Sequence, residues 1–219
     1  MEEVNYQPIP RRTDAPSGKV TQGDNVTRET GRRPEKVAFP EKDIPTKAVI
    51  CFECGHISLV PEAALSARCH HCSAYINLDD IVIHNRSYRG SVRTRGNVTV
   101  REGTNLDGVS VQSHDLILEG RISENIECTG TCTIKTDQHI NGKVHVGTLV
   151  IDRKVNAVFS QPVEAKEVEI LGTFTGILNC RGTVRIAKGG ELIGDLKATR
   201  RILEDGSNHV GHFSVYPLS

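Results

Sequence analysis

The chain has 219 residues and equal numbers of basic and acidic side chains, 27 of each, so its formal net charge is zero. This length allows one ordinary domain with a smaller module and a tail, and the balanced charge gives no global electrostatic reason to expect nucleic acid or an acidic membrane as partner. Trp is absent and Met occurs once, while Val, Ile, Thr and Gly are frequent, so the composition favours stacked strands with tight corners over packed helices.

The sequence shows neither the basic-then-apolar N-terminal pattern of a signal peptide nor a run of 18 consecutive apolar residues. We therefore expect a cytoplasmic protein. The seven cysteines are odd in number and include two close C-x2-C pairs. In a reducing compartment this pattern favours bound metal and free thiols over disulfides.

Residues 1–47 are rich in proline and carry interleaved charges of both signs, with almost no apolar periodicity. This composition predicts a disordered tail. The pairs Arg11-Arg12 and Arg32-Arg33 are candidates for contact with lipid headgroups or nucleic acid, which leaves peripheral membrane association open. The interleaved acidic residues and the lack of an amphipathic helix favour a solvated tail.

Residues 48–80 contain two cysteine pairs in the pattern C-x2-C-x14-C-x2-C, formed by Cys51, Cys54, Cys69 and Cys72. Each C-x2-C turn presents two thiolates, and two such turns complete a closed tetrahedral zinc site. We predict that these four cysteines bind a structural Zn²⁺. A module this small cannot build an adequate core, so metal binding would supply its folding free energy.

Two rival interpretations of this module are weaker. His56, His70 and His71 are alternative ligands, but four thiolates already close the coordination shell. A thioredoxin-like redox role needs one C-x2-C pair on a βαβ framework, and no such framework is indicated.

The same segment resembles small zinc-ribbon domains. The resemblance rests on the opening Val49-Ile-Cys-Phe-Glu-Cys-Gly55, the central Val60-Pro61 and the closing Arg68-Cys-His-His-Cys72. It implies a zinc ribbon whose surface is a candidate site for a protein partner or for nucleic acid.

Residues 81–205 repeat an apolar-x-apolar strand and a Gly-containing corner every 15 to 19 residues. A fixed period of this length predicts a solenoid in which each repeat buries its apolar face against its neighbours. The strand register comprises Val98-Thr-Val100, Leu116-Ile-Leu118, Cys132-Thr-Ile134, Leu149-Val-Ile151, Val168-Glu-Ile170, Val184-Arg-Ile186 and Arg201-Ile-Leu203. The corner register includes Ile140-Asn-Gly142, Val155-Asn-Ala157, Phe174-Thr-Gly176 and Leu192-Ile-Gly194. We expect six or seven coils.

This region resembles the bactofilins, bacterial cytoskeletal proteins built as right-handed parallel β-helices with short disordered tails. The resemblance rests on corners such as Phe174-Thr-Gly-Ile-Leu178 alternating with strands such as Val168-Glu-Ile170. It implies nucleotide-free, end-to-end polymerisation through the β-helix. Residues 206–219 are expected to form a C-terminal tail or a cap over the last coil.

Enzymes on a left-handed hexapeptide β-helix, such as acyltransferases, are the main alternative class. They need a stricter six-residue rhythm, and the candidate groups His114, His139 and His145 lack an accompanying nucleophile pattern. We interpret these histidines as solvent-exposed corner or strand-edge residues. Cys132, at an apolar strand position, is interpreted as a small buried hydrophobe.

The sequence therefore predicts an all-β, non-enzymatic scaffold that polymerises through its β-helix ends and presents a zinc ribbon to a protein partner. Charged substitutions of Leu196 or Ile202 are expected to dissolve its filaments without unfolding it. The alternative is an adapter whose ribbon binds protein or nucleic acid, with the β-helix as a rigid support. Nucleic acid is the less favoured partner because the charge is balanced.

Overall fold

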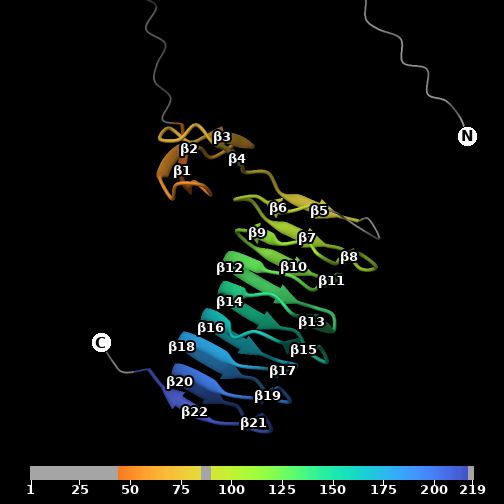
Figure 1. Ribbon diagram of the computed structural model, residues 1–219. Helices are drawn as coiled ribbons and strands as arrows, with labels where there is room; N and C mark the ends of the chain where they lie inside the picture. The colour runs from red at the N-terminus through yellow and green to blue at the C-terminus, as the bar shows by residue number, and fades with distance from the viewer. Residues whose placement is uncertain (1–43, 85–89, 217–219) are drawn as a thin grey trace, which may run out of the picture. The chain divides into compact units, whose positions relative to one another are not determined.

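The computed structural model describes residues 44–84 and 90–216, and the predicted tail lies almost wholly outside these ranges. The described residues form only strands, turns and irregular segments (Figure 1). No helix that could cross a membrane was found in them. The predicted all-β parallel solenoid is confirmed.

Two short antiparallel hairpins open the described chain and form the cysteine module, residues 44–78. Their strands are β1 (Thr46–Ile50), β2 (Ile57–Pro61), β3 (Ser66–Arg68) and β4 (Tyr75–Asn77). Strand β1 pairs with β2, and β3 pairs with β4. A small core of its own lies between them and includes Val49, Val60 and Ile76.

The solenoid follows directly and stacks parallel strands in two registers (Figure 1). The larger sheet contains β5 (Ile81–Ile83), β6 (Val92–Arg93), β7 (Val98–Val100), β9 (Val111–Ser113), β10 (Leu116–Leu118), β12 (Ile126–Ile134), β14 (Val144–Ile151), β16 (Val163–Ile170), β18 (Leu178–Ile186), β20 (Leu196–Leu203) and β22 (Phe213–Val215). The corner strands are β8 (Asn105–Leu106), β11 (Arg121–Ile122), β13 (Gln138–Ile140), β15 (Asn156–Phe159), β17 (Thr173–Thr175), β19 (Glu191–Ile193) and β21 (Asn208–Val210).

The strand register read from the sequence is confirmed residue by residue. One interior column runs through the paired residues Ile81, Val98, Leu116, Cys132, Leu149, Val168, Val184 and Arg201. Alternate side chains of each strand point into the core, so the column from Val98 to Val184 is buried. The solenoid has about eight coils, more than the six or seven expected.

One corner assignment was wrong. The sequence pattern aligned Ile140 with Val155 and Phe174, but the structure pairs Ile140 with Phe159, and Ala157 with Phe174. The coil between β13 and β15 is longer than the average period, so Val155 falls outside the column. The shift brings Phe159 against Phe174, with their stacked ring centroids 4.8 Å apart.

Close packing of successive corners explains why several corner residues are glycines. At the corner inside β14, a Cβ on Gly147 would lie 2.5 Å from the carbonyl oxygen of Thr129 and 2.6 Å from that of Gly130. The neighbouring strand has a register shift between Cys128 and Thr131, where it bends around this corner. A β-bulge of this kind bends the strand and increases its local twist.

The C-terminal residues continue the solenoid. Strand β21 pairs with β19, and β22 pairs with β20. Leu196 is therefore 1% exposed, in register between Leu178 and Phe213. Ile202 pairs with Arg185 and faces outward from the uncovered half of β20, beside Arg201 and Leu203, so of the two residues predicted to lie at the polymer interface only Leu196 is covered by a further strand.

Candidate metal centre

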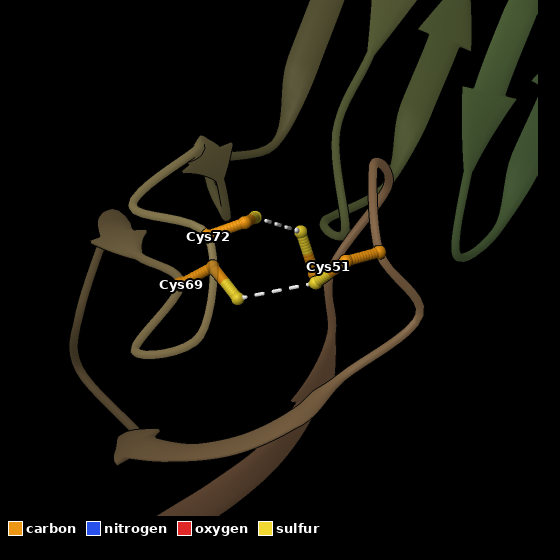
Figure 2. A group of neighbouring side chains, drawn as sticks. Cys51, Cys69 and Cys72 are labelled. Atoms are coloured by element: carbon orange, nitrogen blue, oxygen red, sulfur yellow. Dashed lines mark hydrogen bonds between the residues drawn. The ribbon is translucent and has the colours of Figure 1, made fainter.

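The four cysteines of the C-x2-C pairs converge in the cysteine module. Their sulfur atoms all lie within 4.8 Å of one another. The Sγ atoms of Cys51 and Cys72 are 3.6 Å apart, as are those of Cys54 and Cys69. Figure 2 shows the side chains of Cys51, Cys69 and Cys72 directed toward one another.

The spacing of the sulfurs suits a tetrahedral ion. Four sulfurs at about 2.3 Å from a central Zn²⁺ define a tetrahedron with edges of about 3.8 Å. The two short sulfur separations of 3.6 Å are close to that edge. The residues present therefore fit a closed four-thiolate site.

Two equivalent backbone knuckles position these sulfurs. The N–H of Cys51 donates to the carbonyl of His56, and the N–H of Cys69 donates to that of Ala74, each at 2.9 Å. Within each knuckle the first cysteine carbonyl also accepts an N–H, from Gly55 at 3.2 Å in one and from Ser73 at 2.8 Å in the other. The repeated pattern gives both pairs the same local geometry.

A left-handed residue follows each pair of cysteines. Gly55 has φ 69°, as expected for glycine after the first knuckle, and Ser73 has φ 60° after the second. Only the first of these could be anticipated from residue type, because serine rarely adopts this conformation.

The knuckles favour the thiolate form of the buried cysteine in each pair. Backbone hydrogen bonding from Cys72 lowers the pKa of Cys69 to about 6, and bonding from Cys54 lowers the pKa of Cys51. The backbone of His56 acts to lower the pKa of Cys54, but burial and the other three thiols raise it to about 12. A cation among the sulfurs would reverse that last effect, because it favours four thiolates.

The rival ligands do not join this cluster. Among the described residues, the four cysteines form the single group of three or more side chains suited to hold a metal ion. The rings of His56 and His71 stack on each other with centroids 5.5 Å apart. His70 is exposed.

The other candidate groups remain apart from one another. His114, His139 and His145 are all exposed and contact Thr129, Ser160 and Glu164, respectively. Cys132 is fully buried, as predicted from its apolar strand position.

Sequence reasoning missed a contact between the first knuckle and the solenoid. The Arg95 guanidinium lies 3.8 Å from the centroid of the Phe52 ring, and its Nε donates to the Ile50 carbonyl at 2.7 Å. Arg93 pairs with Glu53 at 2.9 Å. We call these contacts the arginine clamp. No pattern in the sequence predicts the clamp, because Arg93 and Arg95 are of a type expected at solvent-facing positions of a strand.

Comparison with known proteins supports one family. Residues 73–159 match the model of the bactofilin family, described as polymer-forming cytoskeletal. No curated protein and no solved structure matches the chain. The matched segment runs from the end of the cysteine module to β15, and the same strand register continues to β22. The family match and the parallel solenoid together support a bactofilin-type domain in this chain.

Proposed function

We propose that this chain is a non-enzymatic, polymer-forming scaffold of the bactofilin type, which assembles end to end through its solenoid without nucleotide. The observation that carries the proposal is the continuous order of parallel strands from β5 to β22, within a chain whose residues 73–159 match a family described as polymer-forming cytoskeletal. Stacked coils leave strand edges and column ends at each terminus of the stack, and such edges favour pairing with another chain.

In this proposal residues 48–80 form a zinc ribbon, in which Cys51, Cys54, Cys69 and Cys72 hold a structural Zn²⁺. The fit of the sulfur separations to a tetrahedral shell supports this assignment. The site has no role in a reaction. It fixes the two knuckles, and the ribbon is presented to partners in the cytoplasm, where thiolates are kept reduced.

A second candidate function is a ribbon adapter with the solenoid as its support. Strands β1 and β2 place Ile50 beside Ile57 and Ala48 beside Leu59 on one face. The side chains of Ile57 and Leu59 are 61% and 67% exposed. An exposed apolar pair of strands favours a protein partner over the phosphates of nucleic acid.

Electron microscopy of the purified full-length protein, without nucleotide and near physiological salt, separates the two functions. We expect filaments or sheets in the wild type. Leu203→Asp should disperse them, because Leu203 ends an interior column and is 46% exposed. The matched control is Val158→Asp, which places the same charge at an exposed apolar position on the flank, 38% exposed.

Filaments that survive Leu203→Asp would contradict assembly through this end. Uniform small particles in the wild type would contradict autonomous polymerisation and favour the adapter.

A further inference from the structure

The interior columns of the solenoid change character at its C-terminal coil. Seven members of the strand column, from Ile81 to Val184, are apolar, but the eighth is Arg201. The corner column runs from Gln138 through Ala157, Phe174 and Leu192 to His209. The last described member of each column is thus polar.

These two side chains meet across the end of the core. Nη1 of Arg201 lies 2.6 Å from Nδ1 of His209, and the Arg201 guanidinium lies 4.4 Å from the centroid of the Phe213 ring. Phe213 itself packs against the apolar core. We call Arg201, His209 and Phe213 the polar plug.

The hydrogen bonds of the plug indicate the tautomer of His209. A guanidinium only donates, so Nδ1 of His209 accepts from Arg201. The proton of the neutral ring then lies on Nε2, which faces the Gly194 carbonyl at 3.2 Å. Both ring nitrogens are therefore satisfied within one chain, whereas the guanidinium stays only partly buried.

Apolar column ends surround the plug. Leu203 and Val215 continue columns whose preceding members, Ile186 and Ala198, are fully buried. They are themselves 46% and 57% exposed. The end surface consequently combines apolar groups that favour association with a charge that opposes burial.

We propose that the C-terminal end of the solenoid binds the same end of a second copy, and that the polar plug raises the protein concentration at which the two ends associate. This inference rests on the proposed end-to-end assembly. Two identical ends that stack would bring two Arg201 guanidinium groups together and remove both from water. Burial of a charge without a partner of opposite sign is strongly unfavourable. An inward-pointing charge at an edge is also a known protection against unwanted strand pairing.

The test compares the full chain with the double variant Arg201→Leu/His209→Leu, in which both columns end in an apolar side chain. Sedimentation over a concentration series gives the concentration at which assembly begins. We expect that concentration to fall at least about tenfold, because a factor of ten corresponds to only about 1.4 kcal/mol. Thermal unfolding of the double variant should occur at or above the wild-type temperature, which excludes misfolding as the cause.

The matched control is Arg200→Leu/His212→Leu. It removes the same side-chain types from exposed neighbouring positions and leaves both columns intact. We expect wild-type behaviour from this control.

Assembly of the wild type and the double variant at the same concentration would contradict the role proposed for the polar plug but leave the proposed function in place. Weaker assembly of the double variant would also overturn it, since Arg201 and His209 would then be attractive contacts. Failure of both proteins to assemble at any concentration would contradict both the role proposed for the polar plug and the proposed function. If the control assembles at the same low concentration as the double variant, the effect comes from added surface hydrophobicity in general. This result would contradict the role proposed for the polar plug.

Discussion

At the scale of single residues, the geometry of the candidate metal centre depends on the backbone conformation of the knuckles as well as on the cysteine side chains. Ser73 adopts a left-handed conformation that costs a non-glycine residue about 1–2 kcal/mol. The hydrogen bonds of the second knuckle hold it there, with the Ser73 N–H on the Cys69 carbonyl at 2.8 Å. A bound ion would stabilise the same conformation, because it draws both thiolates of the knuckle to one point.

Substitution of one buried ligand tests the metal centre. Cys69→Ser removes a sulfur that is 2% exposed and has a lowered pKa. Metal affinity should fall more than about 100-fold, since even changes outside the ligand shell cost 10- to 100-fold. Titration with Co²⁺ and measurement of its thiolate absorption bands checks this. The control Cys180→Ala should bind like the wild type, and equal binding by both variants would refute the four-thiolate site.

At the scale of elements, the arginine clamp joins the first knuckle to β6 and to the bend that follows it. Arg95 contributes three contacts: its side chain meets the Phe52 ring and the Ile50 carbonyl, and its backbone N–H donates to the Asn77 carbonyl at 2.8 Å. Burial in this contact lowers the pKa of Arg95. The geometry of the knuckle is therefore coupled to the first coils, and an ion held by its thiolates would be coupled to them too.

Loss of the clamp should loosen this junction. In Arg95→Gln, hydrogen exchange of the backbone amide of residue 95 should be about tenfold faster, because hydrogen bonds to charged groups contribute about 1.5–3 kcal/mol. Removal of metal from the wild type by a chelator should have the same effect. Arg121→Gln, an exposed position on β11, serves as the control. Unchanged exchange in Arg95→Gln would show that the contacts do not couple the two elements.

At the scale of the whole molecule, each coil contacts only its neighbours, so stability is close to a sum of repeat and interface contributions. Three thiols belong to this shared core: Cys128, Cys132 and Cys180 are buried. Burial raises the pKa of Cys128 and of Cys180 to about 11, and raises that of the fully buried Cys132 as well. Their ionisation is consequently linked to unfolding of the solenoid.

The sign of this linkage predicts alkaline destabilisation. A thiol whose pKa is higher in the folded than in the unfolded chain stabilises the fold below the unfolded value, about 9, and loses that contribution as pH rises toward about 11. The unfolding temperature should fall over that window.

The matched variant is Cys128→Val/Cys180→Ala, which uses the residues that the structure pairs with these positions, Val146 and Ala165. It should show a smaller fall in unfolding temperature. Identical pH profiles for the variant and the wild type would contradict the linkage.

The sequence determined the repeat, the strand register and the four cysteines, because each is a local pattern. Alternation such as Val98-x-Val100 assigns side chains to faces, and C-x2-C spacing assigns two sulfurs to one turn. The failed alignment of Ile140 with Val155 shows the limit of this reasoning. A period that drifts by a few residues per coil does not reveal which corner absorbs the extra length.

Only the tertiary structure decided which residues meet across coils. The arginine clamp joins Arg95 to Phe52, and the polar plug joins Arg201 to His209, in each case because stacking superposes distant segments. In the sequence, Arg201 stands at a repeat position that is apolar in the preceding repeats, and nothing there explains the exception. In the structure it lies at the end of the core, where its guanidinium is only partly buried.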